Sequence, residues 1–397
     1  MRILLINDYA TLSGGSEVQT RVLRDELVRR GHDARVFASR APSSAGHIWA
    51  DYSCYGTMSR TKTLVSTLNP SAYWNLRHVL HEFRPEVVHV RVFLTQLSPL
   101  ILPLLRDVPS LYSVSLYKPV CPLGTKLLPN RTPCNVHAGV VCYRGGCLPV
   151  HAWLPLMLQM FLWRKWRNVF KLIVAPSDAV KQRLAAEGIA PVQVVPNGEP
   201  VVPARPALVG PPIVAFAGRL VPIKGVDVLV RAFAQVKAKV PAARLLIAGD
   251  GPERGRLTQL IQELGLADAV SMTGNISRSE METLFATAWV QAVPSFTEVF
   301  GNVAAEAMMR GTAVIASHVG GLSEVVSDGE TGLLVPPGDI NACADALLRL
   351  LQDRELAERS GCAGRERALK YFAVDVCVDR FLSLYETITW RASDSHQ

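Results

Sequence analysis

The chain has 397 residues, of which 49% are hydrophobic and 19% are charged. This length predicts two or three domains, and this composition excludes a globally disordered chain. The net charge of +8 belongs to the first half, because residues 1–200 hold 23 Lys and Arg against 12 Asp and Glu. A basic half favours a polyanion or an anionic membrane surface as its neighbour, and the alternative is a solvated basic face.

Strands and helices alternate along the first 200 residues. Short apolar runs predict strands at 3–6, 34–38, 87–90, 111–114, 172–175 and 192–195. Helices are expected near residues 17–30 and from Ser177 to Gly188, where Ser177 and Asp178 provide an N-cap. The first run is a buried strand and not a secretory leader, and eight cysteines without an export signal indicate reduced thiols. We therefore expect a cytoplasmic protein.

A second layout of the same kind follows the Pro- and Gly-rich segment 196–212, which we interpret as a linker. Strands are predicted at 212–217, 244–248, 270–272 and 289–293, and helices at 226–238 and 254–264. This alternation predicts an α/β fold of two doubly wound, Rossmann-like domains with parallel sheets. Ligands bind at the carboxyl ends of such strands, so two facing domains would hold a ligand in a central cleft.

The loop between the strand at 212–217 and the next helix carries two cations between two glycines. Gly218 and Gly225 allow the backbone to pass close to a ligand. Arg219 is a planar fork and Lys224 a point charge, and together they suit a pyrophosphate. Arg and Lys beside glycines are also common in surface loops, so this segment alone does not define a site.

The segment after the strand at 289–293 places two carboxylates around a helix start. Free N–H groups of Gly301, Asn302 and Val303 can bind an anion or a sugar hydroxyl. Glu298 precedes these donors, and Glu306 lies a little over one turn inside the helix. The alternative is a charge that complements the helix dipole together with a solvated Glu.

The run Pro294–Gly321, which continues to Glu324, closely resembles glycosyltransferase family 4. The resemblance extends over most of the chain, through the segments Ser13–Gly15, Pro196–Gly198, Ala217–Gly225, Gly249–Pro252 and Asp328–Gly338. These enzymes are retaining and have the two-domain GT-B fold. The resemblance implies an N-terminal acceptor-binding domain of residues 1–200, on which the C-terminal helix at about 374–397 packs, and a donor-binding domain of residues 201–373.

The resemblance also implies the roles of individual residues. Arg219 and Lys224 would bind the donor diphosphate, Glu298 would contact the transferred sugar, and Glu306 would hold the ribose hydroxyls. The other donor-side residues border the sugar, phosphates or base: Phe300, Gly301, Asn302, Val303, Gly218, Gly249, Gly251 and Ile276 in the Gly274–Ile276 turn. Gly14 and Gly15 would lie near the phosphates and the acceptor. Val299 stands where the family often has Gly, which leaves the donor sugar less defined.

The mechanism implied by the resemblance needs no metal or other cofactor, because Arg and Lys neutralise the leaving diphosphate. The sequence shows no Asp-x-Asp metal clamp and no evident nucleophile with its base. The protein would act by positioning and electrostatics. We therefore predict retaining transfer of a hexose from a nucleotide-diphosphate sugar to a hydroxyl acceptor, in cell-surface polysaccharide or glycolipid synthesis. The alternatives are a nucleotide-sugar epimerase of the same fold and a catalytically silent sugar-nucleotide binding protein.

Two features depart from a simple acceptor domain. Cys121, Cys134, Cys142 and Cys147 are separated by 12, 7 and 4 residues, which suggests a structural zinc site, free thiols or a redox-labile loop. Relatives with a similar insert carry a sugar-contacting His where Ser115 stands here, and Lys118 or His137 are candidates to replace it. His89 is expected to be a satisfied strand-end histidine.

The segment 151–171 is apolar and ends in aromatic and basic residues. Helices at membrane interfaces have this composition, and the alternative is a helix packed over the N-domain sheet. We expect a nucleotide sugar and a sugar or lipid-linked acceptor as partners, with a peripheral position on an anionic membrane surface as a further possibility and no nucleic acid.

Overall fold

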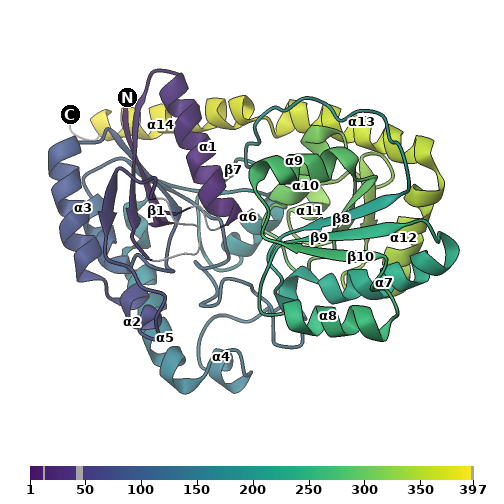
Figure 1. Cartoon of the computed structure of the whole chain (residues 1–397). Coiled ribbons are helices and arrows are strands. Elements are labelled where there is room, and N and C mark those ends of the chain that lie inside the picture. Colours follow the sequence, from purple (N-terminus) through teal and green to yellow (C-terminus); the bar gives the residue numbers. More distant parts are fainter. Residues whose placement is uncertain (12–13, 42–47, 395–397) are drawn as a thin grey trace. The chain divides into compact units, whose positions relative to one another are not determined.

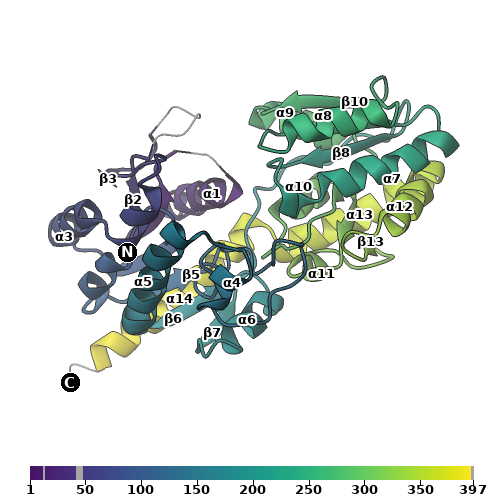
Figure 2. The same ribbon diagram turned by 90° about the horizontal axis from the view of Figure 1, so that it is seen from below.

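The computed structural model of the chain describes residues 1–11, 14–41 and 48–394 (Figure 1). Ser13 of the expected glycine-rich loop lies outside the described residues. The chain divides into two compact units: unit 1 comprises residues 1–198 and 374–397, and unit 2 comprises residues 199–373. Each unit contains one parallel sheet flanked by helices (Figures 1 and 2), which confirms the predicted α/β class.

Unit 1 is built on a seven-stranded sheet of order β3-β2-β1-β4-β5-β6-β7, in which every pairing is parallel. Its strands are β1 (Arg2–Tyr9), β2 (Asp33–Ser39), β3 (Tyr52–Cys54), β4 (Val87–Val92), β5 (Ser110–Ser113), β6 (Leu172–Ala175) and β7 (Val192–Val194). The strand order reverses between β1 and β4. Open α/β sheets bind ligands at the carboxyl ends of the strands that flank such a reversal.

Two helix layers cover this sheet. The helices are α1 (Gly15–Arg29), α2 (Lys62–Thr67), α3 (Pro70–Phe83), α4 (Val141–Arg144), α5 (Val150–Trp166), α6 (Asp178–Ala185), α14 (Val374–Asp394) and the 3₁₀ turns η1 (Pro99–Leu105) and η2 (Arg167–Val169). α1 and α14 share a hydrophobic core with one face of the sheet, which includes Leu111 of β5. The next residue of β5, Tyr112, points to the opposite face, where its ring contacts Trp163 of α5. In the described part of the chain, no helix combines the length and apolarity that crossing a membrane requires.

Unit 2 repeats the arrangement with a six-stranded sheet of order β10-β9-β8-β11-β12-β13, again with parallel pairings throughout. Its strands are β8 (Ile213–Ala217), β9 (Arg244–Ala248), β10 (Val270–Gly274), β11 (Val290–Val293), β12 (Ala313–Ser317) and β13 (Gly332–Val335). Here the reversal lies between β8 and β11. The loops that follow these two strands are therefore the expected ligand-binding loops of this unit.

Three of the helices of unit 2 start at side-chain caps. The helices of this unit are η3 (Pro222–Lys224), α7 (Val226–Lys239), α8 (Arg254–Glu263), α9 (Arg278–Thr287), α10 (Asn302–Arg310), α11 (Leu322–Val325), α12 (Ile340–Gln352) and α13 (Arg354–Tyr371). Ser277 and Glu280 form a capping box for α9, and Asp339 and Asp353 cap α12 and α13. In unit 1 the predicted cap of α6 is confirmed, because Ser177 Oγ accepts from the Val180 N–H.

The sequence located most elements but not their ends. The first strand continues to Tyr9, the apolar helix α5 ends at Trp166, and the C-terminal helix continues to Asp394. β3 was not predicted because its three residues, Tyr52–Cys54, carry no alternation of their own and pair only with β2 at the edge of the sheet.

Candidate functional site

Two loops that follow β8 and β11 meet at the switch point of unit 2. The Phe296 N–H donates to the Ile223 carbonyl over 2.8 Å, which ties the cationic loop to the segment after β11. The Leu220 N–H donates to the Asp250 carbonyl over 2.9 Å, which ties the same loop to the one after β9. Backbone hydrogen bonds therefore gather three predicted donor-side segments at one end of the sheet.

Glycines make these close approaches possible. A Cβ on Gly225, whose φ is +64°, would lie 2.1 Å from the Pro294 carbonyl oxygen. A Cβ on Gly249, whose φ is +135°, would lie 1.9 Å from the Gly218 carbonyl oxygen. Gly251 meets the Leu220 carbonyl oxygen in the same way. No side chain fits between these backbones, and positive φ already disfavours residues with a Cβ.

The two predicted cations differ in their surroundings. Lys224 Nζ lies 2.6 Å from Glu298 Oε2, and both side chains are mostly buried. Arg219 is exposed, and its guanidinium makes no hydrogen bond or ion pair with any described residue. The structure thus joins two of the predicted catalytic residues in an ion pair and leaves the third available for an anion.

The start of α10 presents backbone donors beside Glu298. Gly301 is the N-cap with a φ of +108°, and no side chain caps this helix. N–H groups in the first turn of a helix have no acceptor within the helix, so Val303 offers a donor here. The Gly321 N–H donates to the Glu298 carbonyl over 3.1 Å, which fixes the backbone just before Phe300. Phe300 itself is buried against the ring of Phe372.

Glu306 lies one turn into α10 and is largely buried without a hydrogen bond to any described residue. Burial raises the pKa of this carboxyl to about 7, and the positive charge of Arg278 opposes the shift. Arg278 begins α9, and sequence reasoning missed it because its proximity to Glu306 arises only when α9 packs on α10. A carboxyl group in this setting is suited to hydrogen-bonding hydroxyl groups of a ligand.

The residues predicted to border the base also converge. The Gly249 N–H donates to the Gly274 carbonyl over 2.7 Å, which joins the ends of β9 and β10. Ile276 follows two residues later and is partly exposed. These residues and the loops after β8 and β11 all belong to unit 2.

The predicted acceptor-side residues belong to unit 1. Gly14 is the N-cap of α1 and Gly15 is its first residue, so no side chain caps the start of this helix. Ser115 follows β5, and its Oγ lies 3.5 Å from the Arg91 carbonyl oxygen. Arg91 itself is a buried charged residue on β4 that sequence reasoning passed over, although it stands two positions after His89.

His89 is satisfied, as predicted. Its Nδ1 lies 2.6 Å from Tyr385 Oη and its Nε2 lies 2.7 Å from Ser113 Oγ. Burial holds the pKa of His89 well below its usual value, so the ring is neutral. Of the two residues considered as replacements for the family histidine, Lys118 donates to the Pro122 carbonyl over 2.6 Å, and His137 is exposed beside Glu187 at 2.5 Å.

The prediction of a zinc site at Cys121, Cys134, Cys142 and Cys147 is not supported. Among the described residues, no group of three or more His, Cys, Asp or Glu side chains is arranged to hold a metal ion. All four thiols are free, and burial raises the pKa of Cys142 and Cys147, which favours the thiol over the metal-binding thiolate.

Polar contacts hold the cysteine segment in place. Buried Lys126 donates to Glu187 Oε1 over 2.7 Å and to the Val136 carbonyl over 2.7 Å. Arg183 of α6 donates to the Cys134 carbonyl over 2.8 Å. The segment is thus ordered by ion pairs and backbone contacts between it and the end of α6.

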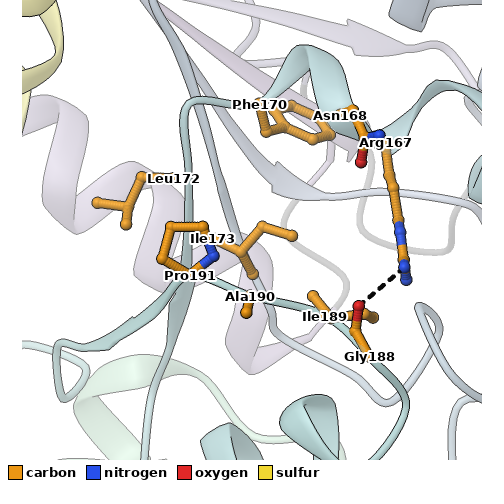
Figure 3. Close-up of a pocket in the computed structure, with 9 residues that line it drawn as sticks. All are labelled: Arg167, Asn168, Phe170, Leu172, Ile173, Gly188, Ile189, Ala190 and Pro191. Atoms are coloured by element: carbon orange, nitrogen blue, oxygen red, sulfur yellow. Dashed lines mark hydrogen bonds between the residues drawn. The ribbon is translucent and has the colours of Figure 1, made fainter.

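A separate small pocket lies beside β6 and β7, at the β7 edge of the unit 1 sheet. Figure 3 shows its lining, which is Arg167, Asn168, Phe170, Leu172, Ile173, Gly188, Ile189, Ala190 and Pro191. The Arg167 guanidinium donates to the Gly188 carbonyl over 2.9 Å across it. Leu172 begins β6 and Pro191 precedes β7, so this pocket lies at the amino ends of the strands and includes none of the predicted site residues.

Two doubly wound sheets, one of which carries a cationic glycine loop and a carboxylate-flanked helix start, define the GT-B class of glycosyltransferases. A sucrose-phosphate synthase from Thermosynechococcus elongatus has a similar structure, with a TM-score of 0.76, 25% identity and coverage of 98% of this chain and 99% of that one. The Anabaena protein HepE, solved with UDP-glucose, has a TM-score of 0.72 at 20% identity over 98% of this chain and 100% of its own, which shows a shared fold.

Family profiles for "Glycosyltransferase Family 4" and "Glycosyl transferases group 1" match residues 13–199 and 203–367. The chain therefore belongs to the family 4, group 1 glycosyltransferases. A D-inositol 3-phosphate glycosyltransferase from Mycolicibacterium smegmatis is 41% identical over 179 residues, which span 44% of this chain and 39% of that protein. One from Nocardia farcinica is 43% identical over 159 residues, which are 38% of this chain and 35% of that protein. Each match thus spans well under half of the relative's length.

Proposed function

We propose that this glycosyltransferase transfers a hexose from a nucleotide-diphosphate sugar to a hydroxyl acceptor with retention of anomeric configuration. The observation that carries the proposal is the switch point of unit 2, where Arg219 pairs with no described residue and Lys224 lies beside Glu298. Two cations and the donors at the start of α10 suit a diphosphate, and the flanking carboxyls suit hydroxyl groups at its two ends.

In the proposed mechanism Lys224 exchanges its partner Glu298 for the diphosphate of the donor. A diphosphate carries more charge than Glu298, so it competes for Lys224 and joins it to Arg219. Glu298 then becomes available to accept hydrogen bonds from hydroxyls of the transferred sugar. The cations stabilise the charge that develops on the leaving diphosphate, and no metal is required for that step.

The ribose of the donor is assigned to Glu306. Its carboxyl lacks a hydrogen-bond partner among the described residues and lies beside Arg278. HepE was solved with UDP-glucose, so we take UDP-glucose as the first donor to test. We assign the donor to unit 2 and the acceptor, on the side of Gly14, Gly15 and Ser115, to unit 1.

A thermal-shift screen of sugar nucleotides tests this function first, because a ligand that binds the folded state raises its stability by mass action. Product analysis of the donor that binds best, with and without acceptor, then separates transfer from epimerisation. The anomeric configuration of the product tests retention. If the donor binds but neither transfer nor hydrolysis is detected, the protein is a silent sugar-nucleotide binder and the proposal is wrong; turnover that is lost in Glu298→Ala excludes that alternative.

We further propose that unit 1 lies on an anionic membrane surface, which suits a lipid-linked acceptor in polysaccharide or glycolipid synthesis. Between His151 and Arg164, α5 carries apolar side chains at every position but Gln159, and a helix of that kind is ordinarily buried. Here Val150, Leu154, Leu158 and Phe161 are exposed by 42–62%. Arg164 and Lys165 at the end of the same helix are also exposed. Exposed apolar side chains with adjacent cations are typical of helices that lie in a membrane interface.

Liposome flotation tests the membrane proposal. Replacing Leu154 and Phe161 by Ser removes two apolar side chains that are each about 60% exposed. At about 2 kcal/mol for burying each fully, the loss is roughly 2 kcal/mol, or about thirtyfold in partition coefficient. Val209→Ser in unit 2, where the side chain is 77% exposed, is the matched control. Equal flotation of both variants and the wild type would refute the assignment of α5.

A further inference from the structure

Arg91 is a buried cation without a counter-charge. Its side chain lies on β4 and is only 4% exposed. Its Nε is fully buried without a hydrogen-bond partner, and the guanidinium makes no hydrogen bond or ion pair with any described residue. A buried charge without compensation is costly, so most buried arginines have a carboxylate or several carbonyls around them.

The neighbours of Arg91 explain why it is unpaired. The guanidinium lies 5.7 Å from the centre of the Phe381 ring of α14. Tyr385 and His89 lie on the same side, and burial keeps both neutral by raising the pKa of Tyr385 and lowering that of His89. Asp8, the most deeply buried carboxylate of this unit, accepts hydrogen bonds from the N–H groups of Thr95, Gln96 and Leu97 and from the Thr95 hydroxyl, and not from Arg91.

The outer edge of the guanidinium keeps a small solvent-exposed area, since the side chain as a whole is 4% exposed. Nη1 and Nη2 have no hydrogen-bond partner among the described residues, yet unlike Nε they are not fully buried. Arg91 therefore has an apolar floor formed by Phe381 and a polar edge that solvent reaches. That edge is the fork with which arginine binds phosphate or carboxylate oxygens.

The position of Arg91 in the sheet is the second indication of a ligand. β4 and β1 flank the point at which the strand order of unit 1 reverses, and Arg91 is near the carboxyl end of β4. Ser115, at the end of the neighbouring β5, lies 3.5 Å from the Arg91 carbonyl oxygen. The N-terminal half of α1 packs on the neighbouring strand, because the Thr20 hydroxyl lies 3.2 Å from Asn7 Oδ1 of β1 and 2.9 Å from the Ser16 carbonyl oxygen.

We propose that Arg91 is the recognition group for an oxyanion, a phosphate or carboxylate carried by the acceptor, bound at the switch point of unit 1. The inference rests on the proposed function only in naming the acceptor as the source, since the donor diphosphate is assigned to Arg219 and Lys224 of unit 2. It makes the acceptor an anionic molecule and Arg91 a residue that determines specificity.

Binding of inorganic phosphate by the full chain tests the inference, measured by calorimetry in an Arg219→Ala, Lys224→Ala background that removes the two donor-side cations. We expect Arg91→Met to weaken phosphate binding by about tenfold or more, because a charge-assisted fork is lost. Arg91→Lys keeps the charge but loses the planar guanidinium, so its phosphate affinity is expected to lie between those of the parent and Arg91→Met. Unligated Arg91→Met should unfold at the same temperature as its parent or higher, because an unpaired buried charge has gone.

The source of the oxyanion is distinguished in the otherwise wild-type chain by titrating UDP and a hexose phosphate against Arg91→Met. Weaker hexose phosphate binding with unchanged UDP binding supports an anionic acceptor, whereas a loss confined to UDP assigns the oxyanion to the donor and overturns the acceptor assignment. Phosphate affinity unchanged in both Arg91 variants overturns the inference as a whole. The two proposals can fail separately. If the Arg91 variants transfer sugar to a neutral acceptor at the wild-type rate, the proposed glycosyltransferase function stands whatever becomes of the oxyanion site. If phosphate binding depends on Arg91 but no transfer is detected, the oxyanion site stands and the proposed function fails.

Discussion

Glu306→Gln should stabilise the protein at alkaline pH while weakening its donor binding. The Glu306 carboxyl has a pKa raised from 4.5 to about 7 by burial. Between these two values the folded chain binds more protons than the unfolded chain at this group, so stability falls as pH rises through that window. The shift of about 2.5 units corresponds to about 3 kcal/mol, and partial exposure reduces this to roughly 2 kcal/mol.

The variant carries no charge at this position, so its stability has no such window. For a unit of this size, 2 kcal/mol corresponds to an increase of about 4–8 °C in melting temperature. We expect Glu306→Gln to melt higher than the wild type at pH 8 without donor and to match it near pH 4.5. Scanning calorimetry over this range measures the difference, with exposed Glu263→Gln on α8 as the control. A Tm difference for Glu306→Gln that is the same at both pH values would refute the reasoning.

Donor addition gives the second half of this test. A carboxylate accepts hydrogen bonds from ribose hydroxyls more strongly than a neutral amide does, so the donor should stabilise the wild type more than Glu306→Gln. An unchanged donor KM in the variant would contradict the ribose role. Removing the neighbouring cation by Arg278→Ala should raise the pKa of Glu306 further and move the stability window to higher pH.

Three further predictions concern the same site. Arg219→Ala or Lys224→Ala should each lower kcat by about 10²–10³, the scale for losing one group that stabilises developing negative charge, and full turnover with a verified donor would show the assignment to be wrong. Gly225→Ala and Gly265→Ala both place a Cβ at a φ near +65°, but only the first meets a carbonyl oxygen at 2.1 Å; Gly265→Ala should therefore cost about 1 kcal/mol and Gly225→Ala considerably more, measured by urea unfolding. Dialysis against EDTA should leave the transfer rate unchanged, and restoration of a lost rate by Mg²⁺ or Mn²⁺ would contradict the metal-independent mechanism.

The sequence was most informative where chemistry and backbone requirement coincide. Gly225 was predicted as a position where the backbone passes close to a ligand because its neighbours in sequence are ligand-binding residue types, and the structure adds a backbone contact, with the Pro294 carbonyl, that also requires glycine there. The Ser177 cap was predictable because capping is decided within four residues. The ion pair of Lys224 and Glu298 was not, since it joins residues 74 positions apart through a loop contact.

The misses have a common physical origin. Cysteine spacing indicates a metal site only when local geometry brings the thiols together, and spacings of 12, 7 and 4 leave that geometry to the fold. Arg91 was overlooked because a charged residue in an apolar run is ordinarily an edge or surface position. Its burial follows from α14, which arrives from the other end of the sequence and covers β4 with Phe381 and Tyr385.

The mostly buried cations at the two switch points differ in whether a carboxylate compensates their charge. In unit 2 Lys224 has a carboxylate partner when no donor is present, so that cation is compensated in the unligated protein and a diphosphate must displace Glu298 to reach it. In unit 1 Arg91 has no such partner among the described residues, so the unligated protein bears the cost of desolvating most of its guanidinium, and an anionic ligand would offset that cost. A ligand without an anionic group gains nothing from Arg91. The unpaired arginine would thus discriminate among acceptors, whereas the paired lysine in unit 2 remains compensated with or without its ligand.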